Sequence, residues 1–207
     1  MAESLNIAIA GLGTVGSATV ALLADQAERI TLRCGRPIAI AAVSARDRAR
    51  NRGIDISPYR WFDDARALAT APGIDAVVEL IGGADGVALE LIEATLRAGR
   101  PVVTANKALL AHHGTALARL AEAKGASLHY EAAVAGGIPI VKALREGLAA
   151  NGIGRIYGVL NGTCNYILTT MRDSGREFDD VLTEAQALGY AEADPRFDVD
   201  GIDSAHK

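Results

Sequence analysis

The stretch that most constrains the fold lies near the start of the chain. Leu5–Ala10 is short and apolar, Gly11-Leu-Gly-Thr-Val-Gly16 follows it directly, and Ser17–Ala24 has a helical pattern. A glycine motif of this spacing is informative only between a strand and a helix, and in that context it indicates a turn that binds a dinucleotide. The alternative is a buried tight turn that binds nothing.

Each residue of this turn has a physical part to play. Gly11 permits the tight turn, Gly13 lets a pyrophosphate approach the backbone, and Gly16 lets the helix pack on the strand. The start of the helix, at Thr14 and Val15, offers unpaired N–H groups and the positive end of the helix dipole to the phosphates. We therefore predict that these five residues bind the cofactor.

The rest of the first half alternates short apolar strands with helices, which is typical of an α/β fold with a doubly wound, Rossmann-like parallel sheet. Ligands of such sheets bind beyond the carboxyl ends of the strands. The expected strands are Ile38–Val43, a short strand that ends at Trp61-Phe62, Ala76–Ile81, Pro101–Thr104 and Leu128–Tyr130. The expected helices are Val87–Ala98 and 108–124, Asp63 or Asp64 caps the helix after Phe62, and polar Asp25–Pro37 reads as a loop.

Three residues at this edge bear on ligand binding. Ser44 and Arg46 follow the second strand, where NAD-specific folds usually carry an acid for the ribose 2′-hydroxyl. Serine and arginine would accept a 2′-phosphate, which favours NADP over NAD, although Arg46 and Arg48 also fit an ordinary solvated helix start. Lys107 follows the strand Pro101–Thr104, at the start of a helix, where a cation opposes the helix dipole and suggests a local use.

Composition excludes several classes of function. The net charge of −4 leaves no electrostatic footprint for nucleic acid. Ile7–Ala24 contains no charged residue, but its glycines and hydroxyl residues fit a buried strand and helix better than a membrane span, so we expect no membrane partner. Cys34 and Cys164 form no metal or redox spacing, which favours a reducing cytoplasm.

The last stretch of the chain carries the strongest chemical signal. Gly189-Tyr-Ala-Glu-Ala-Asp-Pro-Arg-Phe-Asp-Val-Asp-Gly-Ile-Asp-Ser-Ala-His-Lys207 is rich in acids, and Asp203 and Lys207 stand four residues apart. On a helix that spacing places a carboxylate and an ammonium on one face, one turn apart. A solvated acidic helix start would give the same local pattern.

The pattern G-Y-x-E-x-D-P-x-x-D-V-x-G-x-D-x-x-x-K resembles the signature segment of homoserine dehydrogenases, and every fixed position is filled here. V-E-L-I-G-G, T-A-N-K and N-G-T-C-N-Y-I-L elsewhere in the chain resemble the same family. The resemblance implies an oxidoreductase that interconverts L-aspartate 4-semialdehyde and L-homoserine with NAD(P), in threonine, methionine and isoleucine biosynthesis.

The resemblance also implies roles for individual residues. Lys207 would be the catalytic acid/base, with Asp203 beside it and Lys107 in contact with cofactor and substrate. Glu192 would bind the substrate amino group. The remaining implied substrate residues are Asp198, Gly162, Thr163 and Tyr190, and Gly189 joins the cofactor set. A sodium site would use backbone oxygens of Glu131, Val134, Gly136 and Ile138, in a bent segment that runs to Ile140.

We expect a dinucleotide-binding domain in residues 1–135 and the start of an α+β substrate domain in 136–207. The second part should contain the helix Ile140–Ala149, the strand Ile156–Leu160, a helix Cys164–Arg172 capped by Thr163, and the helix Phe178–Leu188. The family's substrate domain continues past the position of Lys207, so we expect this chain to be truncated, with Lys207 poorly held and a homodimer for the full-length parent. Two alternatives stay open: a non-catalytic NADP-binding fragment or sensor module, and a reductase of another small aldehyde.

Overall fold

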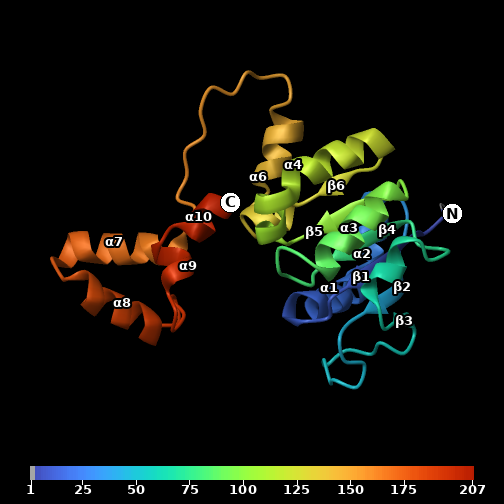
Figure 1. Ribbon diagram of the computed structural model, residues 1–207, viewed down its shortest axis with the longest axis horizontal. Coiled ribbons are helices and arrows are strands. Elements are labelled where there is room, and N and C mark those ends of the chain that lie inside the picture. The colour runs from blue at the N-terminus through green and yellow to red at the C-terminus, as the bar shows by residue number, and fades with distance from the viewer. Residues whose placement is uncertain (1–2) are drawn as a thin grey trace. The chain divides into compact units, whose positions relative to one another are not determined.

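The computed structural model describes residues 3–207 and divides the chain into two compact units, one ending at Gly137 and one running from Ile138 to Lys207. Figure 1 shows the sheet in the first unit and a group of helices in the second. None of the helices in residues 3–207 combines the length and the hydropathy needed to cross a lipid bilayer.

The first unit is built on a six-stranded, wholly parallel sheet with the order β3-β2-β1-β4-β5-β6. This order places β1 at the centre, beside both β2 and β4, so the chain reverses its direction across the sheet at β1, as in a doubly wound fold. The strands are β1 (Leu5–Ala10), β2 (Ile38–Ser44), β3 (Arg60–Phe62), β4 (Ala76–Glu79), β5 (Val102–Thr104) and β6 (Leu128–His129).

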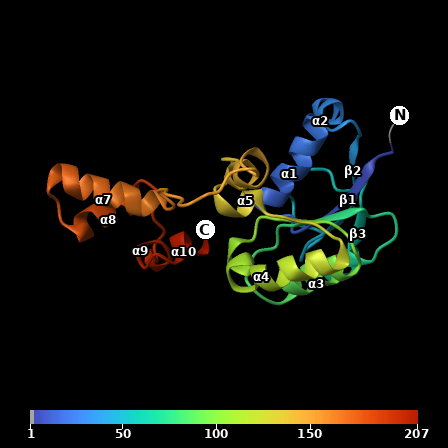
Figure 2. The same cartoon turned by 90° about the horizontal axis from the view of Figure 1, so that it is seen from above.

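Helices cover both faces of this sheet, as Figure 2 shows, with α1 and α2 on one side and α3 and α4 on the other. Alternate residues of β1 pack on opposite faces of the sheet. Ile7 and Ile9 pack with Val20 of α1, whereas Ala8 and Ala10 pack on the opposite side with Leu91 of α3. The elements on the faces are α1 (Thr14–Asp25), α2 (Ala27–Cys34), the 3₁₀ helix η1 (Ala65–Ala69), α3 (Val87–Arg97) and α4 (Lys107–Lys124).

The predicted strands and helices of this half are confirmed within a few residues, and β1 has the predicted bounds. The loop expected over Asp25–Pro37 is wrong, because α2 occupies most of it. Glu28 lies in its first turn and Arg33 in its last, where each favours the helix dipole, and Gly35 ends the helix in the left-handed conformation with a φ of 73°. None of its residues is buried, so a core-facing stripe could not reveal it.

The regular elements in the described residues of the second unit are all helical. The elements after β6 are α5 (Glu131–Val134), still in the first unit, and then α6 (Ile140–Lys142), the π-helical turn η2 (Ala143–Gly147), α7 (Gly162–Ser174), α8 (Phe178–Ala187), α9 (Arg196–Val199) and α10 (Ile202–His206). A small core joins α7 to α8 through Ile167, Val181 and Ala185.

The strand expected over Ile156–Leu160 is wrong: this segment has no regular secondary structure, and its side chains are exposed. The apolar run has strand propensity, but a strand forms only against a partner strand, and residues 138–207 contain none. The bent segment that begins at Glu131 also differs from expectation, because its first four residues form the helical turn α5.

Candidate active site

The turn after β1 has the geometry that its glycines predict. The N–H of Gly11 donates to the carbonyl of Ser44 at the end of β2, 2.8 Å away, and Gly11 has a φ of 96°. A Cβ on Gly16 would lie 1.9 Å from the carbonyl oxygen of Gly11, so only glycine lets α1 approach the turn this closely. No atom lies within 4 Å of the place a Cβ would take on Gly13, so the backbone there is open to a ligand.

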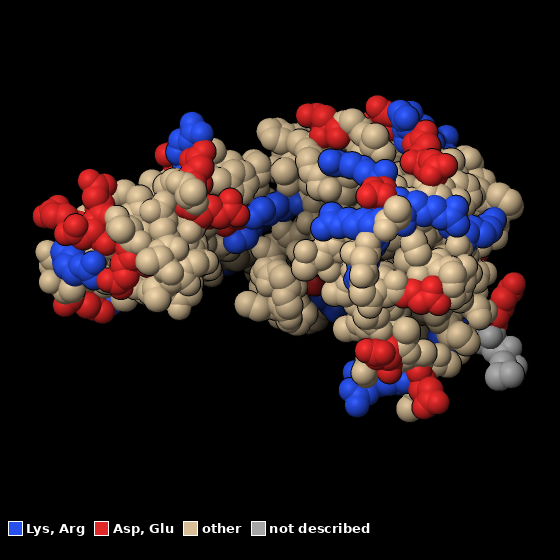
Figure 3. All heavy atoms as spheres, turned by 90° about the horizontal axis from the view of Figure 1, so that it is seen from below, with Lys and Arg blue, Asp and Glu red and all other residues tan. Residues whose placement is uncertain are grey.

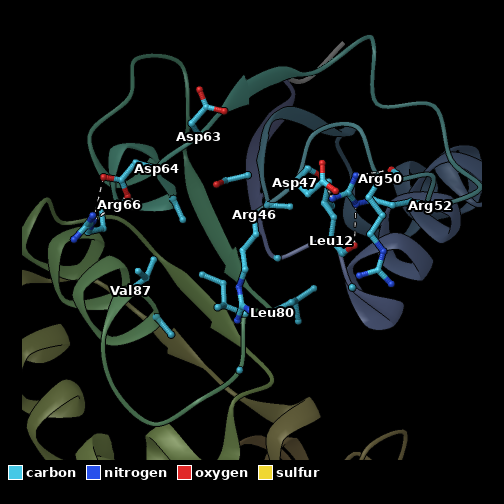
Figure 4. A pocket seen from close by; sticks show the side chains of 18 of the residues that line it. Leu12, Arg46, Asp47, Arg50, Arg52, Asp63, Asp64, Arg66, Leu80 and Val87 are labelled. Atoms are coloured by element: carbon cyan, nitrogen blue, oxygen red, sulfur yellow. Dashed lines mark hydrogen bonds and ion pairs between the residues drawn. The ribbon is translucent and has the colours of Figure 1, made fainter.

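A pocket of about 700 Å³ lies at this turn, in the first unit. Its volume is within the usual range for small-molecule and cofactor sites. Gly11, Gly13, Ser44 and Arg46, which the sequence assigns to cofactor binding, line this pocket, whereas Thr14 and Val15 are exposed residues of the first turn of α1. In Figure 4 the side chain of Arg46 extends into the space between the end of β2 and Leu80.

The loop after β2 adds residues that the sequence interpretation missed. Arg52 donates from Nε to the carbonyl of Leu12, 3.1 Å away, and so fastens this loop to the glycine turn. The guanidinium groups of Arg48 and Arg52 lie over the ring of Trp61, at 5.7 and 6.0 Å from its centroid. A signal for them was present, because four arginines recur at every second position from 46 to 52, directly after a strand.

Acidic and basic groups also reach the pocket from the loop after β3. Asp64 caps η1 by accepting from the backbone of Arg66, as one of the two predicted caps, and it pairs with the Arg66 side chain at 2.9 Å. Asp63 accepts from the indole of Trp61 at 2.7 Å. Both acids follow a strand end, so their place at the ligand edge was predictable from the fold class, but not their place in this pocket.

A buried polar network lies under the same edge. Glu79, at the end of β4, is fully buried and accepts hydrogen bonds from the N–H groups of Ile81 and Gly82 and from the hydroxyl of Thr104. Asn106 caps α4 through Leu109 N–H and donates to the carbonyl of Gly83 at 2.7 Å. The network thus joins the loop after β4 to the start of α4.

Lys107 is the first residue of α4, at the carboxyl edge of the sheet where the sequence places it, and it is half-buried. The residues before it, Thr104 and Asn106, belong to the buried network, so the backbone that carries Lys107 is firmly positioned.

The second unit pairs one acid of the last stretch, Asp203, with Lys207. The ammonium of Lys207 donates to Asp203 Oδ2 at 2.8 Å and to the carbonyl of Leu160 at 2.6 Å. Asp203 is 4% exposed, and the side chain of Lys207 is 22% exposed. The predicted one-turn pairing is confirmed, and Lys207 is held by two partners instead of being poorly held.

Four of the predicted substrate residues fall into two groups. Asp198 lies with Asp203 and Lys207, because the side chain of Asn161 contacts both carboxylates. Thr163 and Tyr190 form the other group, in which the Thr163 hydroxyl donates to the Tyr190 carbonyl at 2.7 Å. Gly162 begins α7, and Gly189 and exposed Glu192 lie in the segment after α8.

The N-cap of α7 is not the residue that the sequence predicted. Asn161, not Thr163, is its N-cap, and its side-chain oxygen accepts from the N–H of Cys164 at 2.7 Å. Burial, together with the negative charges of Asp198 and Asp203, raises the pKa of the Cys164 thiol. Its Sγ donates to the carbonyl of Asp198 at 3.2 Å. Cys164 is therefore a protonated packing residue at neutral pH.

The four carbonyls of the predicted sodium site divide between the two units. Glu131 and Val134 begin and end α5, and Gly136 has a φ of 60°. Ile138 is the first residue of the second unit, and its carbonyl accepts from the N–H of Ile140 at 2.8 Å. The sodium site stays a prediction.

Charge differs between the two units on the face that Figure 3 shows. Lys and Arg side chains gather in rows on the first unit, whereas acidic side chains are prominent on the second. On this face, anionic ligands suit the first unit and cationic ligands suit the second.

Comparisons with known proteins identify one family for both parts of the chain. Residues 11–131 match the family model described as homoserine dehydrogenase, NAD binding domain, and residues 139–207 match the one described as homoserine dehydrogenase. The chain is 52% identical to a homoserine dehydrogenase of Pseudomonas aeruginosa, over 99% of this chain and 46% of that protein. It is 50% identical to one of Neisseria gonorrhoeae, over 99% of this chain and 47% of that protein.

Solved structures give the same result. A homoserine dehydrogenase from Thiobacillus denitrificans superposes with a TM-score of 0.86 at 48% identity, covering 99% of this chain and 47% of that one. A hyperthermophilic archaeal homoserine dehydrogenase in complex with NADPH superposes with a TM-score of 0.81 at 30% identity, covering 99% and 67%. The chain spans about half the length of the curated relatives it matches.

Proposed function

The chain belongs to the homoserine dehydrogenase family, and we propose on that premise that the complete gene product reduces L-aspartate 4-semialdehyde to L-homoserine with NADPH, and catalyses the reverse reaction. In this proposal the first unit binds the cofactor and the second binds the substrate. The observation that carries it is the ion pair between Lys207 and the buried carboxylate of Asp203, at 2.8 Å.

The residues of the glycine turn fit a dinucleotide. The open backbone at Gly13 would leave room for the pyrophosphate, and the N-terminus of α1, which has no side-chain cap, would offer it N–H groups. Arg46 lines the same pocket, where its guanidinium would pair with a 2′-phosphate, and this favours NADP. A bound nicotinamide cofactor would supply the hydride that adds to the aldehyde carbon.

The second unit supplies the proton. As the carbon–oxygen double bond of the aldehyde becomes a single bond, negative charge develops on the oxygen, and the ammonium of Lys207 stabilises that oxygen and donates its proton to it. Asp203 holds the ammonium in place and keeps a negative charge beside it. In the reverse direction the neutral amine of Lys207 accepts the proton of the homoserine hydroxyl.

The remaining proposed residues orient the substrate. Glu192 pairs with the substrate ammonium, and the bond from Thr163 to Tyr190 keeps the start of α7 and the segment after α8 together around the amino-acid end. Lys107 is the second cation of the reaction, carried by the firmly positioned start of α4. We propose a cytoplasmic homodimer for the complete gene product. The sodium ion carries no step of this mechanism.

The test measures NADPH oxidation by L-aspartate 4-semialdehyde and NADPH binding in the same preparation of the complete gene product. We expect turnover, and we expect Lys207→Ala to lower kcat by roughly 1,000-fold with NADPH affinity unchanged. Lys124→Ala, at an exposed position of α4, is the matched control and should retain full activity. Binding without turnover would favour a non-catalytic NADP-binding module, and near-normal turnover by Lys207→Ala would refute the assignment of the acid.

A further inference from the structure

Asn161 lies between two carboxylates of the second unit, those of Asp198 and Asp203. It lies between the irregular segment that ends at Leu160 and the first turn of α7, and it is 6% exposed. Its side-chain nitrogen lies 2.7 Å from Asp198 Oδ1 and 2.8 Å from Asp203 Oδ2, and its side-chain oxygen accepts from the N–H of Cys164. One side chain therefore binds the first turn of α7 and two carboxylates that lie far along the sequence.

The orientation of this amide follows from its surroundings. The nitrogen carries two hydrogens, and each has one carboxylate oxygen to bind. The opposite orientation would set the amide oxygen against both carboxylates and the nitrogen against the N–H of Cys164, with repulsion at every contact. Both hydrogens of the amide are used to hold Asp198 and Asp203 side by side.

Helix capping alone does not explain an asparagine here. Aspartate caps a helix as well as asparagine does, because a cap needs only an acceptor oxygen. An aspartate at position 161 would however place a third carboxylate against the two already present. The nitrogen of the amide, which capping does not use, is the atom that donates to the two carboxylates.

The same carboxylate oxygen links Asn161 to the lysine. Asp203 Oδ2 accepts from Asn161 and also from the ammonium of Lys207, at 2.8 Å in each case. The residue before Asn161 supplies the second partner of the ammonium, the carbonyl of Leu160. Leu160 and Asn161 together therefore determine where the ammonium of Lys207 lies.

We propose that Asn161 is a positioning residue for the proton transfer: its amide holds Asp198 and Asp203 side by side and fixes Asp203 on the ammonium of Lys207. The proposal rests on the proposed function and extends it to a residue that does not itself touch the substrate's reacting atoms.

The consequence for pH dependence follows from the groups that surround Asp203. These are Asp198 from α9, Cys164 from α7, and Lys207 one turn along. His206, on the same helix as Asp203, packs its ring against Phe197 at 5.5 Å. Without the two amide donors, like charges at positions 198 and 203 face each other, and one of them retains a proton to higher pH. A protonated Asp203 no longer offers Lys207 a negative partner, so the acidic limb of the activity profile moves to higher pH.

Two variants separate this role from that of a helix cap. Asn161→Ser retains a good cap but replaces the two amide donors with one hydroxyl donor on a shorter side chain, and Asn161→Asp retains the cap and the size but adds a carboxylate. In the complete gene product we expect Asn161→Ser to lower kcat roughly 100-fold, with NADPH affinity unchanged and the acidic limb of kcat raised by about one pH unit. The activity of Asn161→Asp relative to Asn161→Ser should increase as the pH falls, because the carboxyl that this substitution introduces regains one donor when it is protonated.

The control is Asn165→Ser, an exposed position one turn further along α7, which should match the parent protein at every pH. A uniform loss of activity in Asn161→Ser without any change in the pH profile would show a merely structural role and overturn the proposal. If the parent protein shows no turnover, the proposed function fails by itself, and Asn161 is then judged by ¹³C NMR of the two carboxyl groups. If the two carboxyl groups titrate at the same pH in the parent and in both variants, the inference is refuted. If either of them titrates at higher pH in the variants than in the parent, the inference is supported.

Discussion

The hydroxyl of Thr104 donates a hydrogen bond of 2.6 Å to the carboxylate of Glu79, and both side chains are buried inside the first unit. Thr104 ends β5 and Glu79 ends β4, so the bond joins two neighbouring strands at the edge where ligands of parallel sheets bind. A buried carboxylate persists only when it is well supplied with donors, and Glu79 also accepts two backbone N–H groups from the following loop.

We predict that Glu79→Ala lowers the free energy of unfolding by about 3 kcal/mol, because three donors lose their acceptor inside the protein. Glu79→Gln retains one acceptor oxygen for the backbone N–H groups and should cost about 1 kcal/mol. Urea unfolding measures both values, with Glu122→Ala at an exposed position of α4 as the control. A loss below about 1 kcal/mol for Glu79→Ala would contradict this account.

Alanine substitutions at Gly13 and Gly16 should have different effects. Gly16→Ala places a methyl group 1.9 Å from the carbonyl oxygen of Gly11, so α1 cannot pack, and we expect a loss of about 3 kcal/mol or more, or no folding. Gly13→Ala meets no atom within 4 Å and should leave stability nearly unchanged. Its methyl group would however occupy the space of the pyrophosphate and weaken NADPH binding at least tenfold, by about 1.4 kcal/mol.

Thermal unfolding and NADPH fluorescence, measured on the same samples, check this contrast. Equal losses of stability in the two variants would show that Gly13 is needed for the stability of the fold. Unchanged NADPH affinity in Gly13→Ala would show that the open backbone is not where the cofactor binds.

Arg46 should discriminate between the two nicotinamide cofactors. Arg46→Ala removes a guanidinium from the pocket, and a charge-assisted hydrogen bond to a 2′-phosphate contributes about 1.5–3 kcal/mol. We therefore expect NADPH affinity to fall by roughly 10- to 100-fold, with NADH affinity little changed. Arg119→Ala, at an exposed position of α4, is the control. Equal effects on the two cofactors would remove the argument for NADP.

The stability of the second unit should depend on pH through Glu184. This residue of α8 accepts from the hydroxyl of Tyr166 and from the guanidinium of Arg176, and these two bonds, in that order, hold the pKa of its carboxyl below the usual glutamate range. A group whose pKa is lower in the folded state stabilises the fold above its unfolded pKa, here about 4.3. That contribution is lost as the pH falls through the folded value.

The measurement is the unfolding temperature at neutral pH and at a pH below the unfolded glutamate pKa, in the parent protein and in Glu184→Gln. We expect acidification to lower the unfolding temperature of the parent protein more than that of Glu184→Gln, because the variant has no carboxylate to protonate at this position. Parallel pH dependence in the two proteins would show that Glu184 contributes nothing on acidification.

Local sequence determined a large part of this molecule. The bounds of β1, the turn at Gly11 and the one-turn pairing of Asp203 with Lys207 all followed from spacing, because these groups are neighbours along the chain whenever their element forms. The sheet class followed from the alternation of apolar strands and helices.

Tertiary structure decided the remainder. Ile156–Leu160 has the composition of a strand and forms none, since a strand depends on a partner that the run itself does not contain. Thr163 and Asn161 are both capping residue types, and the choice of Asn161 depends on Asp198 and Asp203, 37 and 42 residues away. Contacts between distant segments form only when helices pack, so the sequence by itself predicted the acid and the lysine, and only the folded chain revealed the amide that holds them together.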